Sequence, residues 1–454
     1  MNRFNHLAVR HGRRTSSPGS RRRLAPIIIL ECYLSFTVFI FVFGPWPWPV
    51  QNPWTLYSYL FLAQAALLFG YLSRIGTDSP KKSYIGSLSS ANLLNISVWL
   101  NIFFVIPYYY TKLGPEGFSF GGILSHIVAG ASDPGKAYSE KFDMPGGSTL
   151  VLYAYMIFSP ILWLAVPLGV AAWKSLSFKM KTAIGFIVVA RCGTWIAMGT
   201  TKGIADNAAI IAISIAATRR DSLTHQKAWL SLSKLRRNAI IVCAISALVF
   251  YFSYSQSSRS GGQLSSIDRG AGITLDTNNI FIAEQPTAIQ AAVAKGSTYL
   301  SQGYYGLSLA LAEPFQWSYG VGHSSALTGI VKKVTGFDAT ERTYLARVED
   351  KGWDMRERWS TIYPWLASDV TFPGTIVLLF LIGRLLASVW TDVQLGDSPY
   401  ALPLFVMLMV GIFYFPANNQ ILSMTETFLA FWGLICLWFF TRGTIKKGGI
   451  NAWN

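Results

Sequence analysis

The sequence predicts an all-α, polytopic membrane protein with about ten transmembrane helices and one large extramembrane loop. Hydrophobic residues make up 52% of its 454 positions and charged residues only 13%, a balance that excludes a soluble globular enzyme. Five stretches contain no Lys, Arg, Asp or Glu: 32–73, 83–111, 144–173, 238–258 and 398–425. Each is long enough, at about 1.5 Å per helical residue, to cross a hydrocarbon core of about 30 Å.

In chain order, a basic tail at 1–24 precedes seven transmembrane helices within 25–255. A large outer loop at 256–370 separates these helices from three more within 371–441, and a second tail follows at 442–454. The ten helices are expected at roughly 25–43, 55–73, 92–109, 149–173, 182–199, 204–218, 238–255, 371–390, 400–416 and 421–441.

Two further stretches are expected to lie on the outer surface of the membrane. The Gly-rich segment near 116–131 is amphipathic, which favours an interfacial position. The stretch 285–312 is almost free of charge, but Gly296, Gly303 and Gly306 interrupt it. We therefore expect two short surface helices there instead of an eleventh span.

The distribution of basic residues predicts the orientation. Seven arginines fall within the first 23 residues, and the segments on that side of the membrane carry 22 basic residues, against four in the short segments on the other side. The positive-inside rule then places both termini in the cytoplasm and the large loop outside. The net charge of +16 is therefore explained by the basic residues on the cytoplasmic side of the membrane, and no nucleic-acid partner is expected.

Cysteine and histidine usage gives no sign of a disulfide framework, a metal site or a cofactor. The four cysteines lie singly in apolar stretches without a CxxC pair, and the five histidines are scattered without an HxxxH motif. We therefore expect no metal ion and no cofactor.

Polar residues within the predicted spans are the informative ones, because the bilayer makes them costly. Arg191 lies in the middle of the fifth span and needs an anionic partner or a wet cavity. Lys202 lies in the tight outer turn that leads into the sixth span, one helical turn before Asp206, where a structural ion pair and anion binding are equally plausible. Asn419 and Glu426 lie near the outer ends of the last two spans. These groups therefore gather towards the outer leaflet.

The outer loop is rich in Tyr and Trp, which suits stacking on sugars as well as an interfacial aromatic belt. Cations at the outer leaflet, aromatic side chains and a large loop together fit chemistry on a lipid-linked anionic glycan. Arginine can hold a diphosphate leaving group bidentately and stabilise its developing charge without a metal ion.

Four stretches resemble the Wzy-type O-antigen (oligosaccharide repeat-unit) polymerases of bacterial surface polysaccharide assembly. They are Thr298–Leu311 running into Tyr319–Ser324, Trp359–Asp369 with Phe372–Gly374, Phe413–Gln420, and more weakly Gly199–Asp206. The resemblance implies a glycosyltransferase C-like fold in the bacterial inner membrane with a periplasmic active site. Its substrates would be an undecaprenyl-diphosphate-linked growing glycan and a single lipid-linked repeat unit, and a chain-length regulator protein is an expected partner.

An acceptor hydroxyl that attacks the sugar must lose its proton to a base. His323 is the only histidine of the large loop and lies in a Gly320-Val-Gly-His setting. In the related O-antigen ligases a loop histidine is similarly implicated. Asp369 is the alternative base, at the point where the loop enters the eighth span.

For the diphosphate we expect Arg191 first, then Lys202 and Arg358. Trp359 and Tyr363 are expected to contact the glycan or to support the site. Asn419 and Glu426 are expected to orient sugar hydroxyls or to anchor Arg191. Two other functions stay open on the sequence alone: an O-antigen ligase, which shares the chemistry, and a lipid-linked oligosaccharide flippase or transporter.

Overall fold

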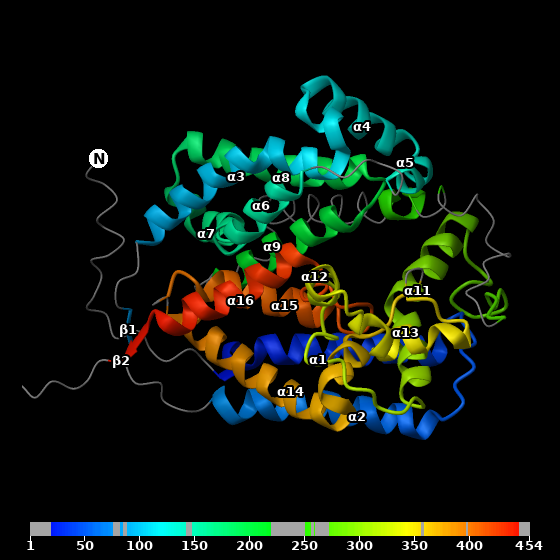
Figure 1. Cartoon of the computed structure of the whole chain (residues 1–454). Helices are drawn as coiled ribbons and strands as arrows, with labels where there is room; N and C mark the ends of the chain where they lie inside the picture. Colours follow the sequence, from blue (N-terminus) through cyan, green and yellow to red (C-terminus); the bar gives the residue numbers. More distant parts are fainter. Residues whose placement is uncertain are drawn as a thin grey trace, which may run out of the picture.

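The computed structural model describes residues 20–75, 82–84, 89–141, 148–218, 250–255, 258, 272–355, 358–395 and 398–444. Within these residues the chain is mostly helical, and its only strands have three residues each. Most of the long helices lie roughly side by side, while α11 runs at a steep angle to them (Figure 1). Most of the two expected tails and most of the expected seventh span fall outside the described residues.

The helices fall into two groups along the chain. Those up to residue 218 are α1 (Ser20–Phe43), α2 (Pro53–Ile75), α3 (Ser90–Leu113), α4 (Phe120–Ser132), α5 (Pro134–Glu140), α6 (Thr149–Leu162), α7 (Ala165–Ala172), α8 (Phe178–Ala197) and α9 (Lys202–Thr218). Those after residue 272 are α11 (Thr287–Ala310), α12 (Ser325–Thr335), α13 (Tyr344–Arg347), α14 (Ile362–Leu395), α15 (Ala401–Phe413) and α16 (Thr425–Phe440). The strands β1 (Lys82–Tyr84) and β2 (Arg442–Thr444) pair antiparallel, so the segments after α2 and α16 meet at one end of the bundle (Figure 1).

In the part of the chain that the structure describes, six helical segments are long and apolar enough to cross a membrane: Arg22–Phe43, Pro53–Ile75, Ser90–Phe118, Thr149–Ser175, Phe178–Ala197 and Ile362–Leu395. Three of the other expected spans, α9, α15 and α16, have 17, 13 and 16 residues. A span needs roughly 20 residues, so these helices are short for a full crossing. The structure therefore supports a helical membrane protein, while the number of ten spans stays a prediction.

The outward faces of the long helices carry large apolar side chains. Phe61 on α2, Phe103 on α3 and Ile157 on α6 are 73%, 69% and 70% exposed. Contiguous apolar surface of this kind is rare in soluble monomers and is typical of a surface that faces lipid. The exposed faces therefore agree with a position in the membrane.

The most extensive helix pair joins α2 to α14, which lie side by side (Figure 1). A Cβ atom on Gly70 would lie 2.0 Å from the carbonyl oxygen of Phe380, and one on Gly383 would lie 2.2 Å from that of Leu67. Only glycine fits at these two contacts, because any larger residue would force the backbones apart. Because both glycines lack a side chain, the backbones of α2 and α14 approach each other closely, and this contact holds α14 against α2.

The helix α14 begins at Ile362, nine residues before the expected start of the eighth span. Thr371 interrupts it with a φ of 67°, a value that non-glycine residues rarely adopt, and Pro373 follows. The expected start at 371 therefore corresponds to a kink. The part before the kink carries Asp369 and belongs to the candidate site.

The expectation of two short helices in 285–312 is wrong, because α11 runs unbroken from Thr287 to Ala310. Two of its three glycines serve close packing, while Gly296 has no neighbour within 4 Å of where a Cβ atom would lie. A Cβ atom on Gly303 would lie 2.1 Å from the carbonyl oxygen of Pro416, and one on Gly306 would lie 2.5 Å from the indole nitrogen of Trp353. Tertiary contacts therefore compensate the low helix propensity of glycine.

Candidate active site

The two residues considered as alternative bases form one hydrogen-bonded pair. His323 Nδ1 lies 2.8 Å from Asp369 Oδ2, which also accepts the backbone N–H of His323 at 2.8 Å. Asp369 Oδ1 accepts the Ser318 hydroxyl at 2.5 Å and the Gly322 N–H at 3.0 Å. Four donors therefore stabilise the ionised carboxylate, and the carboxylate in turn fixes the orientation of the imidazole ring.

A tight turn wraps residues 318–324 around this carboxylate. Tyr319 and Gly320 adopt positive φ values of 59° and 77°. A Cβ atom on Gly322 would lie 2.1 Å from the Ser318 hydroxyl oxygen, so glycine is needed where the backbone N–H approaches Asp369. Ser324 then caps α12, with its hydroxyl 3.3 Å from the backbone nitrogen of Leu327.

The imidazole keeps one nitrogen available for chemistry. The side chains of His323 and Asp369 are 20% and 7% exposed. No described residue forms a hydrogen bond with His323 Nε2, while Nδ1 is occupied by the carboxylate. An imidazole held in this way can accept a proton at Nε2, as in the histidine–carboxylate pairs of hydrolases.

Asn419 holds the backbone of the histidine turn. Its side chain is fully buried, donates to the carbonyl oxygen of His323 at 2.7 Å and accepts the N–H of Leu422 at 3.0 Å. The Ser325 hydroxyl donates to the carbonyl oxygen of Ser423 at 2.7 Å, which adds a second link between the two loops. Asn419 is therefore a positioning residue, and its burial is incompatible with the expected contact to sugar hydroxyls.

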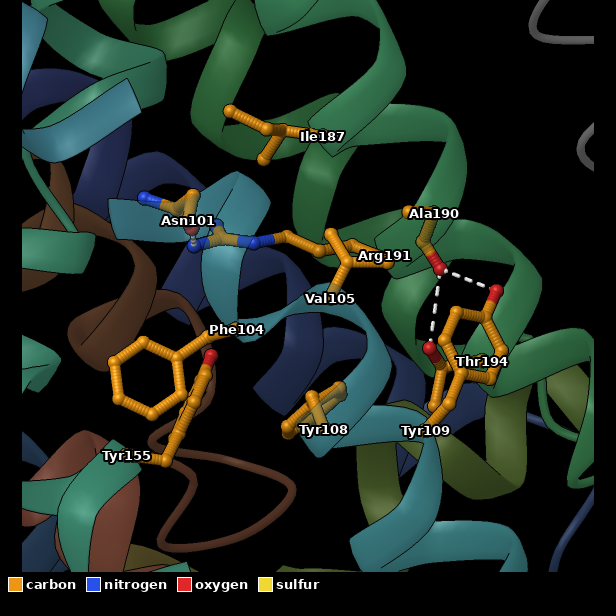
Figure 2. Close-up of a pocket in the computed structure, with 10 residues that line it drawn as sticks. All are labelled: Asn101, Phe104, Val105, Tyr108, Tyr109, Tyr155, Ile187, Ala190, Arg191 and Thr194. Carbon is orange, nitrogen blue, oxygen red and sulfur yellow. Dashed lines mark hydrogen bonds between the residues drawn. The ribbon is translucent and has the colours of Figure 1, made fainter. Parts of the chain in front are cut away.

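Arg191 lies on α8 and extends to a neutral partner (Figure 2). Its Nη2 donates to Asn101 Oδ1 at 2.8 Å, and Asn101 Nδ2 donates to the carbonyl oxygen of Leu162 at 3.0 Å. That carbonyl lies at the break between α6 and α7 within the expected fourth span. Within the described chain, no carboxylate comes within 4.0 Å of Arg191. The expected anchoring by Glu426 or Asn419 is therefore wrong.

Arg191 also lines a cavity of about 100 Å³ with other polar and aromatic residues: Tyr108, Tyr155, Trp195, Lys202, Asp206, Asn207, Tyr414, Gln420 and Glu426. Lys202 Nζ lies 3.3 Å from Asp206 Oδ2, so the structural ion pair is present. Its ammonium also lies 4.9 Å from the centre of the Trp195 ring. The cavity therefore brings Arg191, Lys202 and Glu426 together, as three of the expected site residues.

Lys112 is a site residue that the sequence analysis counted only as an outer charge. It lies in the last turn of α3, and its Nζ lies 3.1 Å from Glu426 Oε1. Glu426 and Asp206 are thus each paired with a lysine, which leaves Arg191 as the surplus cation of the cavity. The useful signal was that Lys112 is the only basic residue between Lys82 and Lys136.

Two cavity-lining acceptors are buried without a donor in the described part of the chain. They are Asn207 Oδ1 and Gln420 Oε1. A buried acceptor without a hydrogen bond costs about 1–3 kcal/mol, so a small movement that exposes these oxygens to hydroxyl groups would be favourable. The cavity therefore combines Arg191, which no described carboxylate pairs, with two lysine–carboxylate pairs and two unsatisfied amide oxygens.

Three expected site residues lie elsewhere. The guanidinium of Arg358 lies 5.4 Å from the Trp353 ring, and the Trp359 ring contacts Tyr299 at 4.4 Å. Tyr363 is 2% exposed and packs against Tyr59 at 5.7 Å. None of the three expected residues lines the cavity, and the burial of Tyr363 excludes contact with a glycan.

One loop joins the histidine pair to the cavity. Asn419 contacts His323, and its neighbour Gln420 lines the cavity together with residues up to Thr427 in the first turn of α16. Consecutive Cα atoms are 3.8 Å apart, so the histidine pair and the cavity both adjoin the segment 418–427. We call this segment the shared loop, although its last three residues begin α16.

Comparisons with known protein families, curated proteins and solved structures gave no match to this chain. Among the described residues, no group of three or more His, Cys, Asp or Glu side chains could hold a metal ion. The chemistry of the site is therefore inferred from its own residues.

Proposed function

We propose that this chain is a metal-independent membrane glycosyltransferase that polymerises undecaprenyl-diphosphate-linked repeat units into an O-antigen or a similar polysaccharide. The proposal includes ten spans in a glycosyltransferase C-like arrangement, a bacterial inner-membrane location with a periplasmic site, and a chain-length regulator as partner. The observation that carries it is the shared loop, which contacts the histidine–aspartate pair through Asn419 and lines the cavity of Arg191 and Lys202 through Gln420. The resemblance of four stretches to O-antigen polymerases, among them Phe413–Gln420 at the start of this loop, supports the reaction class.

In this proposal His323 is the general base. Its Nε2 accepts the proton of the acceptor hydroxyl, while Asp369 holds Nδ1 and stabilises the imidazolium that forms. The fixed turn and Asn419 keep the ring in one orientation, which reduces the entropy lost on reaching the transition state.

The cavity is proposed to hold the diphosphate. Arg191 offers nitrogens that no carboxylate neutralises, and Lys202 and Lys112 lie in pairs that an incoming diphosphate can rearrange. Hydrogen bonds between ionised partners are about twice as strong as neutral ones, so these cations would stabilise the charge that develops on the leaving group.

The bond changes then balance without a further reactant. The acceptor oxygen forms a bond to the sugar carbon attached to the diphosphate, and the bond from that carbon to the diphosphate oxygen breaks. The proton of the acceptor moves to His323, and the carrier leaves as undecaprenyl diphosphate. The growing glycan ends on the new repeat unit.

Deletion of the gene, followed by electrophoresis of the surface glycan, tests this function. A polymerase predicts single repeat units on the final acceptor, with the ladder restored by the wild-type gene and not by His323→Ala. The matched control is His126→Ala, which removes a histidine on α4 whose Nε2 lies 2.6 Å from Glu116 Oε2. It is expected to restore the ladder.

The same experiment separates the other functions. A ligase predicts full-length chains that accumulate on the carrier lipid, and a flippase predicts single units that stay inaccessible from the periplasm. Either result would refute the polymerase. A normal ladder with His323→Ala at wild-type expression would refute the role of the histidine.

A further inference from the structure

A second and larger cavity lies at the C-terminal end of α1, and none of its lining residues belongs to the proposed transfer site. It has a volume of about 530 Å³, within the range of about 300–1,000 Å³ that is typical of small-molecule sites. We call it the aromatic pocket; its lining includes Phe41, Trp46, Trp48, Tyr57, Asp276 and Asn279. It brings together the connection between α1 and α2 and the segment before α11.

Hydrogen bonds fix the walls of the aromatic pocket. The indole nitrogen of Trp46 donates to the carbonyl oxygen of Ala294 on α11 at 3.0 Å. The backbone N–H of Asp276 donates to the carbonyl oxygen of Pro45 at 2.9 Å, and the Asn279 amide donates to that of Phe43 at 3.2 Å. The pocket is therefore formed before any ligand arrives, which lowers the cost of binding.

The aromatic pocket also carries polar groups that need partners. Asp276 is exposed, and only its Oδ1 accepts a hydrogen bond from a described residue, the N–H of Asn278 at 3.0 Å. The indole nitrogen of Trp48 lacks an acceptor among the described residues, but it is buried and not open to the pocket. An exposed carboxylate acceptor beside aromatic side chains is the combination that binds a sugar ring, with its hydroxyls and its apolar face.

Charge argues against a phospholipid headgroup as the occupant. Among the residues that the structure describes, the lining contains the carboxylate of Asp276 and no lysine or arginine. A phosphate group would be repelled by this carboxylate and would find no cation among these lining residues to compensate. A sugar without a negative charge meets neither obstacle.

Ring contacts connect the pocket to the elements that carry the histidine–aspartate pair. The Tyr59 ring near the start of α2 contacts Phe372, just after the kink in α14, at 5.3 Å. Trp48 contacts Trp353 at 6.2 Å, on the segment that follows α13. The pocket wall and Asp369 are therefore joined through packed aromatic side chains.

We propose that the aromatic pocket is a saccharide-binding site that holds one or two uncharged sugar rings of the glycan away from the reacting bond. It rests on the proposed function for the source of the glycan, but binding in the pocket needs no catalysis. Its role is to retain the polysaccharide between successive additions.

The test is the binding of the oligosaccharide released by mild acid from the strain's own surface polysaccharide. Binding to the purified full chain in nanodiscs is measured by calorimetry, and chain length by glycan electrophoresis. Asp276→Asn is the first variant, because Asp276 is exposed and its loss leaves the aromatic packing intact. Trp48→Ala is the second. Trp54→Ala is the matched control, since Trp54 is 83% exposed and lies outside the pocket lining.

We expect Asp276→Asn to weaken binding about tenfold, as the loss of a hydrogen bond to a charged group does, and Trp48→Ala to weaken it further. Trp54→Ala and His323→Ala should bind normally, and both pocket variants should make shorter chains. The proposal is overturned if the wild-type chain does not bind the oligosaccharide, if both pocket variants bind it normally, or if phosphatidylglycerol displaces it. If the wild-type chain binds the oligosaccharide but gene deletion leaves the ladder unchanged, the polymerase function fails and the binding site stands.

Discussion

The pairing of His323 with Asp369 makes a quantitative prediction for Asp369→Asn. The carboxylate accepts four hydrogen bonds, two on each oxygen. An asparagine has one acceptor oxygen, so its amide group must face two of the four donors. Each buried donor left without an acceptor costs about 1–3 kcal/mol, which gives a loss of unfolding free energy of roughly 2–6 kcal/mol.

The effect on turnover follows from the same geometry. When the amide group faces His323, Nδ1 can no longer donate to it, and the ring takes the tautomer that carries its proton on Nε2. The base is then blocked, and a loss of about 10³–10⁴-fold in turnover is expected, as in other histidine–carboxylate pairs. If His323 were a base independent of Asp369, Asp369→Asn would instead be milder than His323→Ala.

The assay is the in vitro extension of lipid-linked repeat units by purified protein, with unfolding followed in the same detergent. Ser318→Ala is the matched control, because it removes one hydrogen bond from Asp369 and leaves both contacts with His323. It should lose stability but keep turnover within about tenfold of wild type. Residues that act as a unit are not additive, so the double variant His323→Ala with Asp369→Asn should be no slower than His323→Ala. Turnover of Asp369→Asn within about tenfold of wild type, with His323→Ala inactive, would refute the reasoning.

Three further predictions address charge, metal and topology. Arg191→Lys should keep the fold but lose most polymerisation, because lysine cannot grip a diphosphate bidentately, and Arg191→Ala should lose it entirely; a normal ladder with stably expressed Arg191→Ala would remove this residue from the site. Purified protein should stay active in EDTA, since cationic side chains take the place of a divalent ion, and inactivation that Mg²⁺ or Mn²⁺ reverses would contradict this. Cysteines introduced at Gly336 and Asn451 should label from opposite sides of the membrane, and labelling from the same side would refute the orientation.

The helical membrane character could be predicted from the sequence because charge-free runs report the bilayer directly. Whether a glycine interrupts a helix could not be predicted from the sequence, because it depends on the groups that pack against that glycine. In α11, a carbonyl group packs against Gly303 and an indole ring packs against Gly306, both from segments distant in sequence, and the helix continues through both positions. The start of α14 was misplaced for a similar reason, because Thr371 introduces a kink through its backbone and not through its hydropathy.

Individual residues of the candidate site could be predicted from the sequence, but the contacts between them could not. His323 and Asp369 were recognised by their chemical types, whereas their contact depends on a turn that closes across 46 residues. Arg191 was recognised as costly in the membrane, and its neutral partner Asn101 carried no charge to mark it. Lys112 is one of the four basic residues in the short outer segments, and only its contact with Glu426 in the structure distinguishes it from the others.

The contact between α2 and α14 also has a consequence for biosynthesis. Gly70 and Gly383 lie about 300 residues apart in the chain, a distance that a ribosome covers in about 15–60 s at roughly 5–20 residues per second. During that interval α2 is inserted without the helix that covers its glycine face. Asp369 is synthesised only near the end of this interval, so the pair of His323 and Asp369 cannot form in a shorter nascent chain. Under the proposed function, a truncated product released into the membrane would be unable to consume lipid-linked sugars.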